Sequence, residues 1–447
     1  MNEQSNRRHW IRSLAGGSLL LPGLMSELLA EDPLAPRTSP LPARAKRVIF
    51  IYATGGVSHI DSFDPKSAAN GRDGNGKDKL MGSQWGWSRN PRCGTAVTDL
   101  FPHLRDVMDE ICLIRSMKSA HFDHSEATLG FHTGSATFAR PSMGSWISYG
   151  LGSFNRNLPS FMVIAPHLPY GGTQVFANDF LPAVHQGTRV VPGEKPILNL
   201  EPRGVTRDQQ RRELDLLAAF DRGHLHGRES DSNLRARMRS FETAFQMQTA
   251  GPEAFDVSTE PEHIRRLYGL DRKVKGPGAD FAWQCLVARR LAERGVRFIE
   301  LVDTGSRPNW DSHGDMKEHE RLAANVDQPT AGLILDLRQR GMLDDTIVLW
   351  ATEFGRTPRR EGKYGRGHHG DCFSIWLAGG GFKGGMVLGE TDDIGSKIVG
   401  QPVEVHDVHA TVLHQLGIDH EKLTYRHSGR DFRLTDVFGH VMTDVLA

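Results

Sequence analysis

The sequence predicts an α/β protein with three layers, in which a mostly parallel central sheet lies between helices on both faces. Short apolar runs with the composition of buried strands alternate along the chain with segments of helical period. This alternation is typical of parallel strands, because each parallel connection has to cross the sheet and usually does so as a helix. The 447 residues are enough for one large domain of this kind, and we find no internal repeat.

Six largely apolar runs account for the predicted strands. A strand that is buried on both faces is apolar along most of its length, without polar residues at every second position. In chain order the runs are residues 47–53, 111–114, 158–164, 296–302, 347–350 and 372–377. The predicted helices are residues 100–108, 281–294, 316–340 and 406–416, and a helix and small-residue turns alternate over residues 125–150.

The domain organisation follows from changes in composition along the chain. Residues 31–46 form a Pro-rich linker, and the folded domain is expected at residues 47–447. Residues 66–98 are rich in Gly, Asn, Lys and Trp without helical period, which indicates a long excursion. A mostly helical insert is predicted at about residues 200–280. Its strongest period lies in residues 207–250, and we expect the apolar face there to be packed core, made of Leu214, Leu217, Phe220, Leu234, Met238, Phe241 and Phe245.

The N-terminus resembles a twin-arginine export signal, which we place at residues 1–30. Arg7 and Arg8 precede an apolar stretch, residues 13–29, that glycines and a proline interrupt, so it is too short and broken for a comfortable membrane span. A good A-x-A cleavage site is missing, which leaves open membrane anchoring through an uncleaved signal. An ordinary basic start is the alternative. The predicted location is the periplasm or cell envelope.

Charge and cysteine content exclude some classes of function. Lys plus Arg and Asp plus Glu both number 54, and no basic stripe or nucleic-acid motif is present, so we expect no nucleic-acid partner. Twenty-one histidines, several of them beside Asp or Glu, favour metal or proton chemistry. The four cysteines are far apart and form no C-x-x-C pair, so they indicate neither a disulfide scaffold nor a cysteine zinc site.

Acids and histidines follow four of the predicted strands. In open α/β sheets, ligands bind beyond the carboxyl ends of the strands, so these side chains are expected to meet there. The stretch 346–370 is the richest, with a buried strand followed by a glycine- and arginine-rich loop that ends in two adjacent histidines. The four clusters are Ser58, His59, Asp61 and Asp64; His121, Asp123, His124 and Ser125; Asp311, His313 and Asp315; and Glu353, His368 and His369.

Carboxylates mixed with imidazoles are a typical ligand set for a divalent metal. They suit zinc first, with manganese and calcium as alternatives, although calcium would want more oxygens. Simpler roles remain open for some members. Asp61 and Asp64 are equally compatible with helix caps or Asx turns, and His121 and His124 with a loop that has no ligand role.

At these motifs the chain resembles the domain-of-unknown-function 1501 family, which belongs to the alkaline phosphatase and sulfatase superfamily. The motifs are GGVSHIDSFDPK, WDSHGD, EFGRTP and the histidines after Gly367, and the resemblance runs from about residue 45 to the C-terminus. Residues 405–413 are similar to a late sulfatase helix, and residues 378–389 to the glycine-rich turn before it. The resemblance implies an alkaline-phosphatase-like sandwich.

The resemblance also implies hydrolysis of sulfate or phosphate esters by a metal-activated nucleophile. Asp311 and His313 match the superfamily's metal pair, and Glu353 sits where the aspartate of an Asp-His pair is expected. Phe354 replaces the histidine of that pair. His368 or its neighbour matches the downstream metal histidine.

The nucleophile is less well defined by this resemblance. Thr133 and Gly134 align with the Thr-Gly that closes the nucleophile helix of sulfatases. Counting back, the nucleophile position falls on His124, with Ser125 adjacent, and the C-x-P-S-R motif of sulfatases is missing.

Taken together, the sequence predicts an exported metal-dependent hydrolase of sulfate or phosphate esters, either small molecules or polysaccharides. The alternative is a degenerate envelope protein that binds a metal or an anionic saccharide without turnover. Ser125 or His124 is expected as nucleophile or general base, and Arg356 as a clamp for the anionic group. The predicted metal ligands, or their supporting residues, are His59, Asp61, His121, Asp311, His313, Glu353, His368 and His369.

Overall fold

The computed structural model describes residues 34–67, 80–197, 200, 204–228, 231–274, 279–306 and 308–447. The predicted export signal lies outside these residues. The described chain forms a nine-stranded mixed sheet with the order β12-β4-β11-β8-β1-β7-β5-β6, and β15 pairs with β4. The strands are β1 (Arg47–Tyr52), β4 (Ile111–Lys118), β5 (Phe161–Ile164), β6 (Thr188–Val190), β7 (Phe298–Val302), β8 (Thr346–Ala351), β11 (Phe373–Ala378), β12 (Val387–Leu388) and β15 (Val403–Glu404).

The predicted mostly parallel sheet is confirmed. β1 lies in the centre and pairs in parallel with β7 and β8, with Val48 opposite both Phe298 and Ile347. β11 is the exception, because it runs antiparallel to both of its neighbours, β4 and β8. All six predicted strands are present, with shifted ends.

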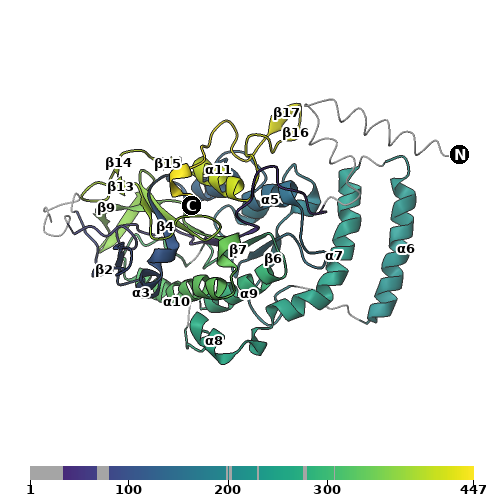
Figure 1. Ribbon diagram of the computed structural model, residues 1–447, viewed down its shortest axis with the longest axis horizontal. Helices are drawn as coiled ribbons and strands as arrows, with labels where there is room; N and C mark the ends of the chain where they lie inside the picture. Colours follow the sequence, from purple (N-terminus) through teal and green to yellow (C-terminus); the bar gives the residue numbers. More distant parts are fainter. Residues whose placement is uncertain are drawn as a thin grey trace.

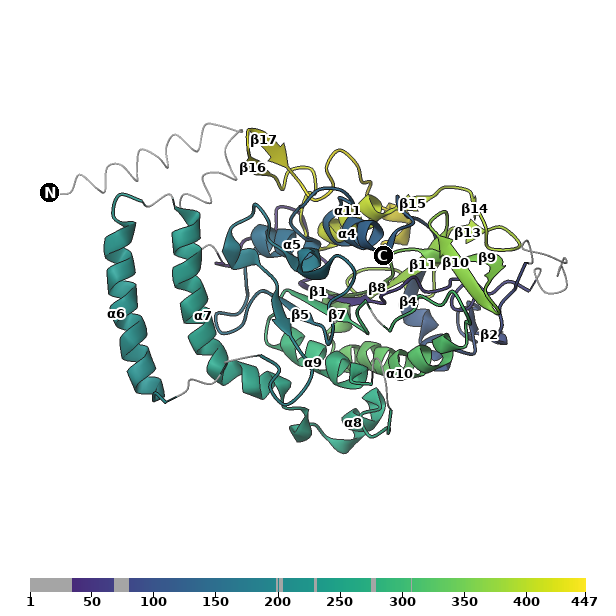
Figure 2. The same cartoon turned by 180° about the vertical axis from the view of Figure 1, so that it is seen from behind.

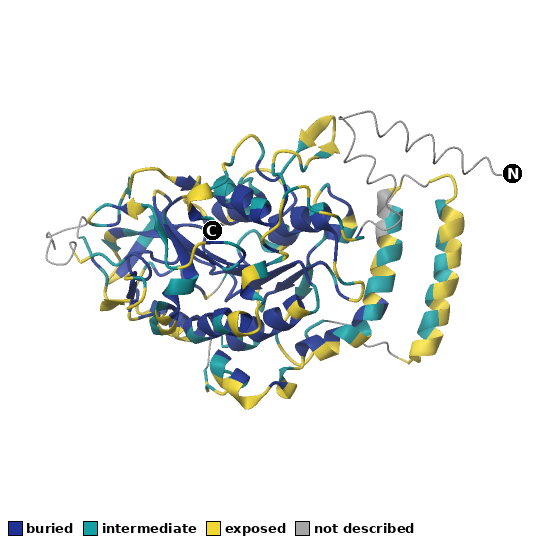
Figure 3. Cartoon of the chain, in the orientation of Figure 1, coloured by how far each residue is buried: buried dark blue, intermediate teal, exposed yellow. Residues whose placement is uncertain are grey.

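Helices cover both faces of the sheet, as predicted (Figures 1 and 2). Along β1, Ile49 and Ile51 belong to one core, while Val48, Phe50 and Tyr52 belong to the other, because successive strand side chains point to opposite faces. The first core packs under α3 (Pro102–Asp106), α9 (Phe281–Glu293) and α10 (Glu318–Gln339). The second packs under α4 (His124–Thr133), α5 (Met143–Leu151) and α11 (Val405–Gln415). Figure 3 shows the sheet as the buried middle layer.

The helical segment between β6 and β7 differs from its prediction. It contains α6 (Arg207–Leu225), α7 (Ser232–Phe255) and α8 (Glu262–Tyr268). The expectation of a packed apolar face is wrong for α6, in which no residue is buried and Phe220 is 68% exposed. Figure 3 shows α6 standing away from the body beside α7. A helical period identifies an apolar face, but it does not say whether another element covers that face.

The described part of the predicted linker lies against the domain. The backbone N–H groups of Arg37, Leu41 and Arg44 donate to carbonyls at the ends of α5 and α11. The excursion at residues 66–98 contains a small hairpin of β2 (Trp87–Arg89) and β3 (Ala96–Thr98). Among the helices that the structure describes, none combines the length and apolar character that a membrane crossing requires.

The glycine- and arginine-rich segment after β8 forms a hairpin, and its prediction as a loop is wrong. β9 (Gly355–Glu361) and β10 (Gly365–His369) pair antiparallel, with His368 opposite Arg356 and His369 opposite Gly355. Two further small hairpins are β13 (Glu390–Thr391) with β14 (Ile398–Val399), and β16 (Tyr425–His427) with β17 (Arg430–Phe432).

Candidate metal centre

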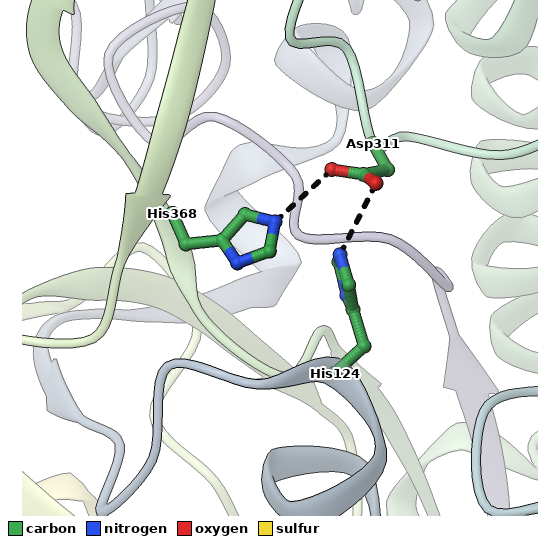
Figure 4. Close-up of side chains that lie close together, drawn as sticks. All are labelled: His124, Asp311 and His368. Carbon is green, nitrogen blue, oxygen red and sulfur yellow. Dashed lines mark hydrogen bonds and ion pairs between the residues drawn. The ribbon is translucent and has the colours of Figure 1, made fainter.

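Histidine and aspartate side chains converge beyond the carboxyl ends of the central strands. Asp311 follows β7, His368 lies on β10 of the hairpin that follows β8, and His124 is the first residue of α4. Figure 4 shows both imidazoles pointing at the Asp311 carboxylate from different sides. One ligand atom from each of the three residues lies within 4.8 Å of the other two. This confirms that loops far apart in the chain meet at one edge of the sheet.

The distances in this group are those of ion pairs and hydrogen bonds. His124 Nε2 is 3.3 Å from Asp311 Oδ2, and His368 Nε2 is 3.2 Å from Asp311 Oδ1. His313 joins from the open side, with its Nε2 2.9 Å from both Asp311 Oδ1 and His368 Nε2. On its other edge, His313 Nδ1 contacts the carboxylate of Glu361 at 3.0 Å. The described site is therefore one carboxylate surrounded by three imidazoles.

Glu353 supports this group from beneath. Its side chain is fully buried, and its Oε1 accepts hydrogen bonds from the Gly55 N–H at 2.8 Å and from His124 Nδ1 at 2.7 Å. Its Oε2 accepts from the hydroxyls of Tyr52 and Thr352, both at 3.1 Å. Burial would raise the pKa of Glu353, but the hydrogen bond from His124 and the other donors lower it. With both oxygens occupied, Glu353 reaches the site only through His124.

The Glu353 contact fixes which nitrogen of His124 faces the site. Because Nδ1 donates to the carboxylate, the neutral ring carries its lone pair on Nε2. That nitrogen is buried and lies 3.3 Å from Asp311 Oδ2, which pairs with it when the ring is protonated. Burial would lower the pKa of His124, but the hydrogen bonds and charges of Asp311 and Glu353 raise it to about 9. A buried imidazole nitrogen that faces a carboxylate is where a cation, either the proton of the ring or a metal ion, would be expected.

Arg356 does not have the geometry of an anion clamp, which corrects its predicted role. Its side chain is fully buried. The guanidinium donates to the carbonyls of Gly55, Gly56 and Arg366 and to Asp311 Oδ1, the last at 2.6 Å. Burial would raise the pKa of Asp311. Hydrogen bonds from His124 and His368, together with Arg356, nevertheless hold that pKa far below its usual range. Arg356 therefore positions Asp311 and keeps it ionised.

Asp61 lies outside the converging group. Arg366 binds its carboxylate with two nitrogens, Nε at 2.7 Å and Nη2 at 3.3 Å, and both side chains are fully buried. The Ser58 hydroxyl donates to the same carboxylate at 2.6 Å, and the Gln84 N–H does so at 3.2 Å. These contacts use the acceptor capacity of Asp61 without any metal.

His59 and His369 also lie elsewhere and hold a neighbouring turn. His59 Nε2 is 2.9 Å from the Gly395 carbonyl, and His369 Nε2 is 2.9 Å from the Ser396 carbonyl. The two rings stack with their centroids 6.2 Å apart. Burial lowers the pKa of both, that of His59 to about 4. Neutral imidazoles that donate to backbone carbonyls are a structural arrangement.

Two other predicted site residues lie at the start of α4, one before it and one in its first turn. His121 is half-buried before the helix, and the converging ligand atoms do not include its own. Ser125 is exposed in the first turn, where its N–H donates to Asp123 Oδ1 at 2.9 Å and so caps the helix.

Sequence reasoning missed three residues that shape the site. Tyr52 donates to Glu353 from the end of β1, and Tyr170 stacks on the His124 ring. Asn309 accepts a hydrogen bond from the Asp311 N–H at 3.0 Å. Asn309 precedes the WDSHGD motif and could have been found there, whereas nothing in the local sequence singles out Tyr170.

Three residues of this site, Asp311, His313 and His368, lie on the motifs that carry the family resemblance. A family model also matches the chain. The chain belongs to the DUF1501 family of proteins of unknown function. The match covers residues 45–446, nearly the whole predicted domain. No curated protein matches this DUF1501 chain.

A comparison with solved structures finds matches at low identity. PsFucS1 sulfatase from Pseudoalteromonas sp. is 10% identical, with 90% of this chain and 72% of that chain covered and a TM-score of 0.38. Lipoteichoic acid synthase LtaP from Listeria monocytogenes is 10% identical, with 90% and 78% covered and a TM-score of 0.39. Alkaline phosphatase from the Antarctic bacterium TAB5 is 12% identical, with 80% and 96% covered and a TM-score of 0.33.

Proposed function

We propose that this DUF1501 protein is a metal-dependent hydrolase of sulfate or phosphate esters. One observation carries the proposal: ligand atoms of His124, Asp311 and His368 lie within 4.8 Å of one another, and the buried Nε2 of His124 faces Asp311. A cation at this point would contact all three ligand atoms and would take the place of the proton that His124 otherwise directs at Asp311.

The donor set favours zinc among the common divalent ions. His124, Asp311 and His368 supply two imidazole nitrogens and one carboxylate oxygen, and His313 is close enough to be the fourth ligand. Zinc and manganese accept such mixed sets, whereas calcium prefers six to eight oxygens. The His124–Glu353 hydrogen bond is the outer contact that metal-binding histidines usually make.

Several side chains around this site have assignable roles in the proposed reaction. When bound, the ion would neutralise charge on the ester oxygens and activate the attacking group. His124 would hold the ion through Nε2, so the same nitrogen would not be available to attack the ester. Ser125, exposed one residue further along α4, is then the side chain left to act as nucleophile. Arg356 keeps Asp311 ionised and in place.

The substrate class and location are part of the proposal. The motif resemblance supports sulfate or phosphate esters, of small molecules or of polysaccharides. The resemblance of residues 1–30 to a twin-arginine signal supports export to the periplasm or cell envelope, with anchoring if the signal is not cleaved.

One observation favours the alternative of binding without turnover. Phe354 stands where the resemblance expects a second metal histidine, and its ring packs against His124 at 4.8 Å and His368 at 4.6 Å. With an apolar ring at this point, the described residues offer one group of ligand atoms close enough to hold an ion. Two-ion sites, in contrast, stabilise both the attacking and the leaving oxygen. A single ion could therefore serve to bind an anionic saccharide.

Metal analysis combined with ester hydrolysis tests both functions. We expect the purified protein to hold one zinc ion per chain and to hydrolyse an aryl sulfate or an aryl phosphate, with loss of activity in chelator. Asp311→Asn should lower the zinc affinity by at least about 100-fold, since even outer-contact substitutions cost 10–100-fold. The exposed Asp393 provides the matched control, Asp393→Asn, which should change neither property.

The outcomes separate the two candidates. Turnover that requires the ion and falls in Ser125→Ala supports the hydrolase. A bound ion with no turnover of either ester supports the binding protein. No ion at equilibrium with micromolar zinc would overturn both.

A further inference from the structure

We propose that Tyr170 and Asn309 form a bracket that positions His124 and Asp311. The bracket joins the segment after β5 to the turn after β7, and it touches two of the residues that would hold the ion. The inference deepens the proposed function and rests on it for its effect on ion binding. Neither residue is in the predicted site.

Tyr170 fixes the plane of the His124 ring. The two rings stack nearly parallel, with centroids 4.3 Å apart and an interplanar angle of 15°. The hydrogen bond from Nδ1 to Glu353 holds one point of the imidazole and leaves the ring able to turn about that contact. A flat ring packed on its face removes this freedom, so the two contacts together define where Nε2 points.

Asn309 connects Tyr170 to Asp311 through its amide group. Its Nδ2 donates to the Tyr170 hydroxyl at 3.1 Å and to the Ser306 carbonyl at 2.8 Å. Its Oδ1 accepts from the backbone N–H of Asp311 at 3.0 Å. Asn309 is only 7% exposed, so these bonds face little competition from water. The Asn309 amide thus fixes the position of the Tyr170 ring and the start of the turn that contains Asp311.

The bracket also decides from which side the site is open. The His124 side chain is 10% exposed beneath Tyr170, whereas the His313 side chain is 40% exposed. A substrate or a metal ion would therefore enter from the His313 side, and Tyr170 would close the opposite wall. Tyr170 and Asn309 are positioning residues in this arrangement, because they act through His124 and Asp311.

A chemical probe of His124 tests the bracket without any metal. In chelator and at fixed pH, we expect Tyr170→Leu to raise the rate of His124 carbethoxylation by diethyl pyrocarbonate about fivefold or more, as followed by peptide mass spectrometry. Tyr170→Phe keeps the stacked ring and should raise it no more than about threefold. His440, whose side chain is 94% exposed, serves as the internal standard and should not change.

Zinc affinity, measured by competition with a chromogenic chelator, gives the second readout. Tyr170→Leu and Asn309→Ala should each weaken it by roughly 10-fold, the size usual for outer contacts of metal ligands. Phe180→Leu is the matched control, because Phe180 makes a similar stack on His427, with centroids 5.0 Å apart and an angle of 16°, outside this cluster. It should alter neither readout.

A double substitution keeps the test decisive even if Tyr170→Leu fails to fold. Tyr170→Phe should have less than a twofold effect on carbethoxylation in the Asn309→Ala background, because the donor to the hydroxyl is already gone. The bracket would be overturned if Tyr170→Leu and Asn309→Ala both left the His124 reactivity unchanged and kept the wild-type zinc affinity. If the wild-type protein binds no zinc but the reactivity pattern holds, the bracket stands and the proposed function fails.

Discussion

Asp311 and Asp61 each pair with a buried arginine of the β9–β10 hairpin. Arg356 contacts Asp311 at 2.6 Å, and Arg366 contacts Asp61 at 2.7 Å. The Asp61 carboxylate is fully buried, and its remaining contacts are hydroxyl and backbone donors. The Asp311 carboxylate is 24% exposed and faces three imidazoles, among them His368. The same type of pair is a structural tie in one place and the base of a candidate ion site in the other.

The adjacent histidines of β10 show how the two regions become different. His368 points to Asp311, and His369 points to the carbonyl of Ser396. Successive side chains of a strand face opposite sides, so two neighbouring histidines on β10 serve two regions. Residue type and nearness in sequence therefore do not define a shared site. The direction of each side chain does.

Removing Asp61 should have the largest effect in this comparison. Asp61→Ala leaves the Arg366 guanidinium buried without its counter-charge, and we expect the free energy of unfolding to fall by about 3–5 kcal/mol. Asp311→Ala should cost only about 1–2 kcal/mol, because the Asp311 side chain is 24% exposed and water can reach the vacated position. Urea unfolding in chelator measures both values. Equal losses would show that the two pairs do not differ as the structure indicates.

Exchanging the two histidines of β10 separately should affect zinc binding next most strongly. His368→Gln should weaken zinc affinity by at least about 100-fold, or about 2.7 kcal/mol, because a ligand is lost. His369→Gln should leave the affinity unchanged, since the new amide can still donate to Ser396. Isothermal titration with zinc compares the variants at one pH. A loss of affinity in His369→Gln would mean that the two regions form one site.

The dependence of zinc affinity on pH should be the smallest of these effects, measured per pH unit. An ion on His124 Nε2 has to displace the proton there. Burial opposes that proton, but Asp311 and Glu353 favour it and set the pKa at about 9. Zinc affinity is therefore predicted to rise about tenfold per pH unit up to about pH 9 and to level off above it. A flat profile across pH 7–9 would show that His124 is not a ligand.

Without metal, the raised pKa of His124 should make the free energy of unfolding fall as the pH rises. The folded pKa of His124 lies above the ordinary value of 6.5, so its contribution is complete below about pH 6.5. That contribution should be lost as the pH rises through about 9. Urea unfolding in chelator across this window should show the decline, and His124→Gln should lack this part of it.

The positions of the strands and of several site residues depend on the local sequence, so they could be predicted from it. The six strands follow from apolar runs, because burial on both faces demands them. Asp311, His313 and His368 could be named because acids and histidines after buried strands lie at one edge of the sheet. Phe220 marks the limit of that reasoning, since its helical period was evident while its exposure was not.

Only the tertiary structure decided which of the predicted residues act together. Glu353 was predicted as a metal ligand or a supporting residue, and the structure gives it the supporting position beside His124, because hydrogen bonds from four groups occupy its oxygens. Arg356 was predicted to clamp the anionic group and instead is buried against backbone carbonyls and Asp311. Composition and spacing place a residue on an element. Its partners depend on the direction of the side chain and on what distant segments bring to it, and these are fixed only when the chain is folded.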